Sequence, residues 1–242
     1  MDVSTLNQTV LHIRDSIISE KFTQHVVVNV AKIVNMRKDV QLSRSINSCD
    51  IINIDGMGVV WGARLLGYKI PERVAGIDLF NALIQMSAKE HLPIYLLGAT
   101  DAVVRATVDK LKLQDPTLII AGYHHGYFWD DEKNVVEKIR ASGAKLLFVA
   151  ITSPKKENFI DKWRQELGVT FVMGVGGTFD VISGKVMRAP LWMQNSGLEW
   201  LFRVIQEPRR MWKRYLTTNS QYAFMLLKEK IKNLASTSTG PH

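Results

Sequence analysis

Short apolar runs alternate with segments of helical spacing over the first three quarters of the chain. Continuous apolar runs predict buried strands at 25–29, 50–54, 93–97, 117–121, 145–149 and 169–173. Apolar residues at three- and four-residue steps predict helices between them, most clearly at 102–112, 132–141 and 158–167, after a leading helix and turn in 1–22. This alternation predicts an α/β fold with a mainly parallel sheet covered by helices on both faces.

The alternation stops after Asp180. Residues 190–232 have helical spacing that is interrupted near Pro208, and residues 236–242 form a polar tail typical of disorder. A length of 242 residues suits one domain with an addition. We therefore expect a Rossmann-like domain over 1–190, a helical appendage over 191–235 and a disordered tail over 236–242.

Positive charge is concentrated in the appendage. Residues 185–232 contain ten Lys or Arg and three Glu, which gives +7 of the formal net charge of +8, and Trp192, Trp200 and Trp212 lie among them. A basic, aromatic segment suits a surface that meets both phosphate and an apolar or headgroup environment. It predicts an anionic partner such as a nucleotide, nucleic acid, phospholipid or pyrophosphate-bearing substrate. The alternative is an ordinary pair of amphipathic helices with a solvated charged face.

Several classes of protein are excluded or disfavoured. The single cysteine, Cys49, rules out a disulfide framework and indicates a reducing cytosol; we expect it to be buried and unreactive. No apolar run reaches the roughly 18 residues of a transmembrane helix, and the first residues do not resemble a signal peptide. Asn29-Val-Ala-Lys32 replaces the Gly-x-Gly-x-x-Gly turn that a nicotinamide-dependent oxidoreductase needs after its first strand. We expect a cytoplasmic protein.

Candidate ligand-binding residues follow the predicted strands, because open parallel sheets bind ligands beyond the carboxyl ends of their strands. They are Asn29, Asp55-Gly-Met-Gly58, Gly98-Ala-Thr100, His124-His-Gly-Tyr-Phe128, Ser153-Pro-Lys-Lys-Glu157 and Gly174-Val-Gly-Gly-Thr-Phe-Asp180.

The acidic and glycine-rich candidates each have a structural alternative. Asp55 either caps the following helix or acts as a general base. Gly174-Val-Gly-Gly177 either turns bare N–H groups toward an anion or forms a plain tight turn. Asp180 either binds a ribose or base or caps the next helix.

The basic candidates are equally open. Lys155 and Lys156 oppose the dipole of the helix they open, which indicates an anion between them unless the turn is simply solvated. His124 and His125 have no partners at metal-ligand spacing, and the chain contains no Asp-x-Asp pair. We predict no metal site and no cofactor.

Together these stretches resemble the WecG/TagA/CpsF family of bacterial glycosyltransferases from about residue 25 to 215. The shared order and spacing of the stretches, rather than one motif, carry the resemblance. They are Asp55-Gly-Met-Gly-Val-Val60, Arg73-Val-Ala-Gly-Ile-Asp78, Gly126-Tyr-Phe128, Pro154-Lys-x-Glu157, Gly174-Val-Gly-Gly-x-Phe-Asp180, Gly184, Arg188-Ala-Pro190, Gly197-Leu-Glu-Trp200, Arg203 and Glu207-Pro-Arg209.

The resemblance implies transfer of a sugar from a UDP-sugar to a polyprenyl-pyrophosphate-linked acceptor, with inversion and without a metal. It implies that Asp55 is the catalytic base and that Asn29 lies in the active site. Residues implied in nucleotide-sugar binding are Tyr127, Lys156, Glu157, Gly176, Gly177, Asp180 and Asp78. The appendage is implied to close the site and to dock on the anionic inner face of the cell membrane, and the residues implied to contact pyrophosphate or membrane are Arg188, Arg203, Arg209, Arg210 and Arg214.

Two positions depart from the family pattern. The family usually has glutamine at the position of Lys156 and often has threonine at that of Val27. Both positions lie near the sugars, so a donor other than UDP-N-acetylmannosamine fits the sequence. The runner-up function is a nucleotide- or nucleic-acid-binding α/β protein, although no aromatic-rich RNA signature or helix-turn-helix pattern is present. A homo-oligomer is left open.

Overall fold

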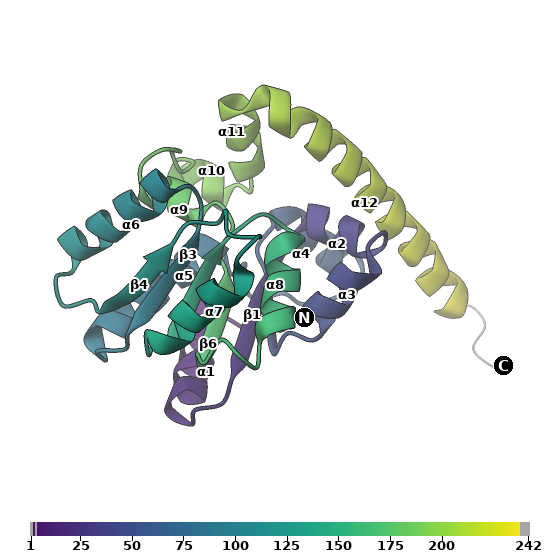
Figure 1. Cartoon of the computed structure of the whole chain (residues 1–242). Coiled ribbons are helices and arrows are strands. Elements are labelled where there is room, and N and C mark those ends of the chain that lie inside the picture. The colour runs from purple at the N-terminus through teal and green to yellow at the C-terminus, as the bar shows by residue number, and fades with distance from the viewer. Residues whose placement is uncertain (1, 3, 238–242) are drawn as a thin grey trace.

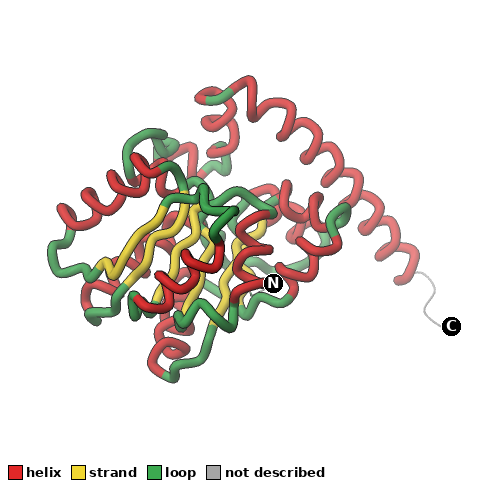
Figure 2. Tube along the Cα trace, viewed as in Figure 1, coloured by secondary structure: helices red, strands yellow, loops and turns green. Residues whose placement is uncertain are grey.

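A six-stranded parallel sheet forms the centre of the computed structural model, which describes residue 2 and residues 4–237 (Figures 1 and 2). The strands are β1 (Thr23–Val28), β2 (Ile51–Ile54), β3 (Ile94–Gly98), β4 (Ile120–His124), β5 (Leu146–Ala150) and β6 (Phe171–Gly174). Their order is β2-β1-β6-β5-β3-β4, and every neighbouring pair is parallel. The predicted α/β fold class is confirmed.

Helices cover both faces of the sheet. They are α1 (Leu6–Ile18), α2 (Val30–Met36), α3 (Val40–Asn47), α4 (Met57–Leu65), α5 (Gly76–Lys89), α6 (Asp101–Gln114), α7 (Glu132–Ala141), α8 (Lys155–Trp163), α9 (Thr178–Ile182), α10 (Leu191–Asn195), α11 (Glu199–Gln206) and α12 (Pro208–Thr237).

Alternate residues of each central strand serve opposite cores, because strand side chains alternate between faces. In β5, Leu146 and Phe148 pack in one core with α1, α5, α6 and α9, whereas Leu147 and Val149 pack in the other with α7 and α8. A third cluster joins β1 and β2 to α3 and α4. Burial on both faces explains why these strands read as continuous apolar runs.

Two elements are displaced from their predicted positions. β4 begins at Ile120 rather than 117, because Asp115 accepts hydrogen bonds from the backbone N–H groups of Thr117 and Leu118 and holds that segment in a turn. α8 runs from Lys155 to Trp163 rather than over 158–167. It starts directly after Pro154, and the chain leaves the end of the helix through a turn that reaches Gly168.

The C-terminal appendage, α10 to α12, lies above the carboxyl edge of the sheet (Figure 1). The predicted break falls at Pro208, the first residue of α12, a position that suits proline because it donates no N–H. α12 is 30 residues long and runs back across α2 and α4. It continues to Thr237, two residues into the predicted tail; the remaining tail lies outside the described residues.

No helix within residues 4–237 is both long and apolar enough to cross a membrane.

Candidate active site

Asp55 and Asn29 lie side by side at the carboxyl ends of β2 and β1. A Cβ placed on Gly56, the residue after Asp55, would lie 3.2 Å from Cβ of Asn29. Asn29 caps α2, since its Oδ1 accepts the N–H of Lys32 at 3.0 Å. The amide nitrogen of Asn29 is the part of the side chain that this cap leaves for a ligand.

Asp55 does not cap the helix that follows it. The N-cap of α4 is Gly56, which makes no side-chain cap. Instead, Oδ1 of Asp55 accepts the N–H of Gly76, the first residue of α5, at 3.3 Å. Of the two alternatives for Asp55, capping of the next helix is therefore wrong, because the side chain turns across the strand ends toward α5.

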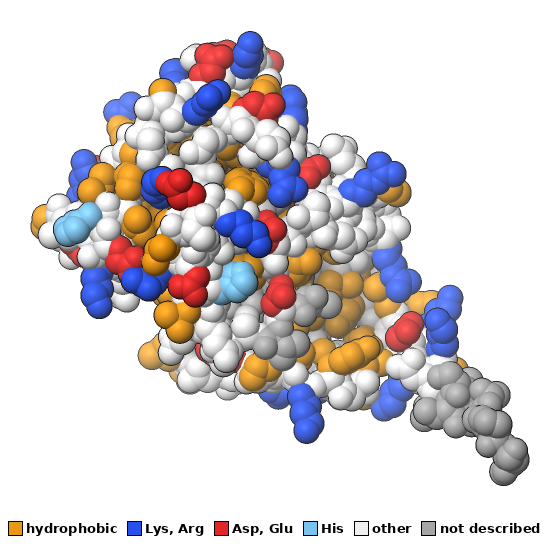
Figure 3. Space-filling model, turned by 90° about the horizontal axis from the view of Figure 1, so that it is seen from below, with side chains coloured by type: hydrophobic (Ala, Val, Ile, Leu, Met, Phe, Trp, Pro, Cys, Tyr) orange, Lys and Arg blue, Asp and Glu red, His pale blue; other side chains and the backbone are white. Residues whose placement is uncertain are grey.

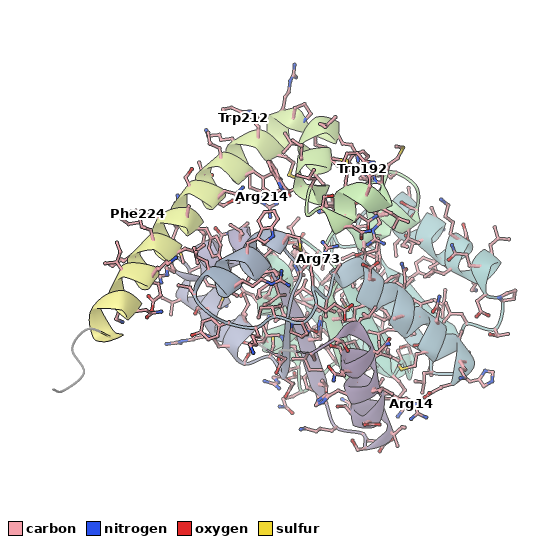
Figure 4. All side chains as sticks on the ribbon, turned by 180° about the vertical axis from the view of Figure 1, so that it is seen from behind. Arg14, Arg73, Trp192, Trp212, Arg214 and Phe224 are labelled. Atoms are coloured by element: carbon pink, nitrogen blue, oxygen red, sulfur yellow. The ribbon has the colours of Figure 1, made fainter. Side chains whose placement is uncertain are left out.

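The appendage brings charged side chains to Asp55. Nη1 of Arg73 donates to the backbone oxygen of Asp55 at 3.3 Å and lies 3.1 Å from Oε2 of Glu199 on α11. Oε1 of Glu199 also lies 3.3 Å from Nη2 of Arg203. Figure 4 shows Arg73 and Arg214 beneath the appendage, between it and the sheet.

The pKa of the Asp55 carboxyl is raised. Burial is the main cause; Arg73 and Arg203 lower the pKa, Glu199 raises it, and the N–H of Gly76 lowers it. A carboxylate with a raised pKa at a strand end is a suitable general base, because a stronger base takes a proton more readily.

A second charged group lies between β1, β6 and α8. Oε1 of Glu157 is 2.9 Å from Nζ of Lys32 and 3.0 Å from Nζ of Lys156, and Lys32 also donates to the backbone oxygen of Val27 at 2.8 Å. Lys156 is only 6% exposed and Glu157 2%. The alternative of a solvated turn is therefore wrong for Lys156, whereas the exposed Lys155 lies 4.8 Å from the ring centroid of Trp129.

The two lysines share one carboxylate, and the pKa values of Lys156 and Glu157 reflect this arrangement. Burial and the charge of Lys32 lower the pKa of Lys156 to about 8, against the attraction of Glu157. Burial raises the pKa of Glu157, but Lys156 and Lys32 outweigh it and lower that pKa to about 2. The group therefore keeps a positive charge near the site, and Oε2 of Glu157 is buried without a hydrogen-bond partner among the described residues.

The glycine-rich turn follows β6. Lys156 packs against Gly174, where a Cβ would lie 2.6 Å from Cε of the lysine. Gly176 has φ of +56°, which favours glycine, and a Cβ on it would meet open space. Asp180 is the third residue of α9 and caps no helix; its Oδ1 lies 3.1 Å from Nζ of Lys185. The open space above Gly176 leaves room for a ligand here, and Oδ2 of Asp180 lies 4.0 Å from where a Cβ on Gly177 would be.

Tyr127 lies beyond the opposite edge strand, β4, and is 70% exposed. Its N–H donates to Nδ1 of His125 at 3.1 Å, and Nδ1 of His124 lies 2.9 Å from the backbone oxygen of His125. Neighbouring parallel strands lie about 4.8 Å apart, so the five steps from β2 to β4 span roughly 24 Å. The candidate residues thus form a row across the whole sheet edge.

The remaining predicted residues divide into two groups. Asp78 and Arg188 pair with each other through two contacts, Oδ1–Nη1 at 2.7 Å and Oδ2–Nη2 at 2.8 Å. Arg209 and Arg214 of α12 are exposed, and the side chain of Arg210 lies outside the described residues. Arg214 acts electrostatically on Lys156, so it faces the site.

Sequence patterns missed three residues of this edge. Arg73 and Glu199 lie within stretches that carried the family resemblance, but nothing in the chain indicated that they pair. Lys32 sits three residues after Asn29, where its N–H is capped, and its burial could not be read from the sequence.

Cys49 is buried, as predicted. Its Sγ lies 3.2 Å from the backbone oxygen of Ser45, and burial raises the pKa of the thiol to about 12. Within residue 2 and residues 4–237, no group of three or more His, Cys, Asp or Glu side chains could hold a metal ion.

The comparison with known families identifies the chain. A model of the Glycosyl transferase WecG/TagA/CpsF family matches residues 1–236. The chain belongs to this family. Its WecG/TagA/CpsF membership confirms the resemblance and makes the protein a glycosyltransferase.

Two curated relatives belong to bacilli. The chain is 38% identical over 185 residues to the N-acetylglucosaminyldiphosphoundecaprenol N-acetyl-beta-D-mannosaminyltransferase of Bacillus subtilis strain 168, covering 76% of this chain and 71% of the relative. It is 37% identical, with the same coverage, to the protein of the same name in Bacillus spizizenii.

Proposed function

We propose that the protein transfers a sugar, with inversion, from a UDP-sugar to a polyprenyl-pyrophosphate-linked saccharide in cell-surface polysaccharide assembly. The names of the relatives support a diphosphoundecaprenol-linked acceptor. The donor is a hexose or N-acetylhexosamine, and Lys156, in place of the usual glutamine, contacts the donor or the acceptor phosphates.

The row of candidate residues suggests how two substrates share the edge. The nucleotide lies over the ends of β6, β5 and β4, where Tyr127 offers a ring for stacking and Asp180 an acceptor for a ribose hydroxyl. Gly176 and Gly177 let the diphosphate approach the backbone. The acceptor hydroxyl then lies at the β1–β2 end, beside Asp55 and Asn29.

In this arrangement Asp55 takes the proton from the acceptor hydroxyl as its oxygen attacks the anomeric carbon. The bond from that carbon to the UDP oxygen breaks, and UDP leaves with the electron pair on the opposite face. Arginines of the appendage, together with the positive charge around Lys156, offset the charge on the departing diphosphate. We propose that this charge serves in place of a metal.

The observation that carries the proposal is Asp55, with its raised pKa, on a strand end that the appendage covers. Asp55→Asn keeps the shape and can still accept the N–H of Gly76 but removes the base. We expect kcat to fall at least about 100-fold, with little change in UDP affinity. The assay measures transfer from a panel of UDP-sugars to a polyprenyl-pyrophosphoryl sugar, with and without EDTA.

Asp109→Asn, on an exposed face of α6, is the matched control. Near wild-type turnover by Asp55→Asn would exclude the base assignment. Activity lost in EDTA and restored by Mg²⁺ or Mn²⁺ would exclude the metal-free mechanism.

We further propose that α12 docks on the inner face of the cell membrane. Trp212, Leu216, Phe224, Leu227 and Ile231 are exposed and recur at three- and four-residue multiples, so they share one side of the helix. Figure 4 shows Trp212 and Phe224 pointing away from the body of the protein, whereas Arg214 lies on the inner side. An exposed apolar stripe among Lys and Arg suits a helix lying in a lipid interface.

The face opposite the appendage differs from this stripe. Figure 3 shows positive and negative side chains interspersed there rather than gathered by sign. We expect the double variant Trp212→Ser, Phe224→Ser to bind anionic vesicles at least tenfold more weakly, and wild-type binding to weaken with salt. Leu113→Ser, at an exposed position of α6, is the control. Undiminished vesicle binding by the double variant would exclude this face of α12.

A further inference from the structure

One ion-pair cluster joins the appendage to the sheet domain. Glu199 is the first residue of α11, Arg73 lies in the segment before α5, and 126 residues separate them along the chain. Both side chains of this pair are 16% exposed. The carboxylate of Glu199 places one oxygen on Arg73 and the other on Arg203, one turn further along α11.

The same cluster surrounds Asp55. Arg73 uses Nη1 for both Glu199 and the backbone oxygen of Asp55, so that nitrogen bridges α11 to the end of β2. Gly197, before α11, packs against Met57 and Trp61 of α4, and α11 also packs on α12. Among these contacts, the carboxylate of Glu199 is the one that joins α11, through Arg73, to the backbone of Asp55.

We propose that Glu199 is a positioning residue that fastens α11 over Asp55 by holding Arg73 and Arg203 in place. Arg203 then stands beside Asp55 at the carboxyl end of the sheet only while the appendage is docked. This inference rests on the proposed role of Asp55, but the docking itself does not.

Glu199 also sets the charge that Asp55 experiences. The groups facing Asp55 are Arg73 before α5, the N–H of Gly76 at the start of α5, Glu199 and Arg203 on α11, and Tyr215 on α12. Glu199 raises the pKa of Asp55, whereas both arginines lower it. Without the charge of Glu199 the pKa of Asp55 falls, so the base loses its proton at lower pH and becomes weaker.

The test is Glu199→Gln, compared with Glu229→Gln on α12 as a control. Hydrogen exchange on the full-length protein without substrate reports docking: we expect α11 amides to exchange about tenfold faster or more in Glu199→Gln, from the loss of charge-assisted hydrogen bonds. In the transferase assay, kcat/KM should fall and its acidic limb should move to lower pH. A role in packing alone would not move that limb.

Arg73→Lys, alone and together with Glu199→Gln, completes a double-mutant cycle. The effects of the two substitutions on α11 exchange should be far from additive, because both remove the same interaction. Unchanged α11 exchange in Glu199→Gln would overturn the proposal, and so would an unmoved acidic limb. If Glu199→Gln does not fold, Glu199→Asp, which keeps the charge but withdraws it by one methylene, is judged by the exchange of the α11 amides alone, and unchanged exchange there would equally overturn the proposal. If the wild type transfers no sugar from any UDP-sugar, the proposed function fails while the exchange measurement still decides the docking.

Discussion

Replacing Lys156 with glutamine is expected to stabilise the protein at neutral pH, although it removes an ion-pair partner. In the wild type, two buried ammonium groups share Oε1 of Glu157 at 2.9 and 3.0 Å. The substitution leaves Lys32 and Glu157 as a balanced pair, and Lys32 keeps its bond to the backbone oxygen of Val27. The excess buried charge, which is costly, disappears.

The pKa of Lys156 gives the size of the effect. It falls from 10.5 to about 8. At about 1.36 kcal/mol per pH unit, holding this lysine charged costs about 3 kcal/mol. Glutamine is shorter than lysine and loses part of the packing of the lysine stem on Gly174. We therefore expect the free energy of unfolding to rise by about 1–3 kcal/mol and the Tm by roughly 2–10 °C.

The dependence of the free energy of unfolding on pH distinguishes removal of the buried charge from other causes of stabilisation. Because the pKa of Lys156 is lower in the folded state, that state binds fewer protons than the unfolded chain between pH about 8 and 10.5. The stability of the wild type should therefore rise across this window relative to Lys156→Gln.

Urea unfolding at pH 7 and pH 9.5, followed by tryptophan fluorescence, measures both effects. Lys155→Gln at the exposed neighbouring position is the control, and Glu157→Gln, which strands both lysines, should destabilise by about 3–5 kcal/mol. The reasoning is refuted if Lys156→Gln is less stable than the wild type at pH 7, or if both proteins show the same change with pH.

Two further substitutions test the candidate site and the docking of α12. Lys156→Gln should also alter kcat/KM across a UDP-sugar panel, because it removes a positive charge at the strand ends; an unchanged profile would mean that Lys156 does not contact the substrates. Gly62→Ala should loosen the packing of α12 on α4, since the added Cβ would lie too close to Oη of Tyr222. The second substitution Tyr222→Phe removes that oxygen and should restore part of the docking. Trypsin cleavage within 209–232 measures this, and a Gly62→Ala variant as resistant to trypsin as the wild type would contradict the packing.

The strands could be predicted because each apolar run is buried on both faces. The helices between β1 and β2 could not: α2 and α3 have seven and eight residues, too few to show a helical period. β4 was misplaced because a side chain, that of Asp115, decides where its turn ends.

Single residues at strand ends were also predictable, since the ends of parallel strands meet at one edge. Partners were not. Glu157 and Lys32 come from separate segments, and Glu199 meets Arg73 only because α11 folds back over β2. Pairing at such separations depends on the whole topology.

The strand order has a consequence for how new specificities arise in this family. β2 and β4 are the two edge strands, so Asp55 and Tyr127 stand at opposite margins, with the glycine turn and Lys156 between them. Each contribution comes from a separate loop on a rigid strand. Under the proposed placement of the two substrates, a mutation in one loop alters recognition of one substrate while the residues proposed to bind the other stay in place. Donor and acceptor preferences can then change one at a time.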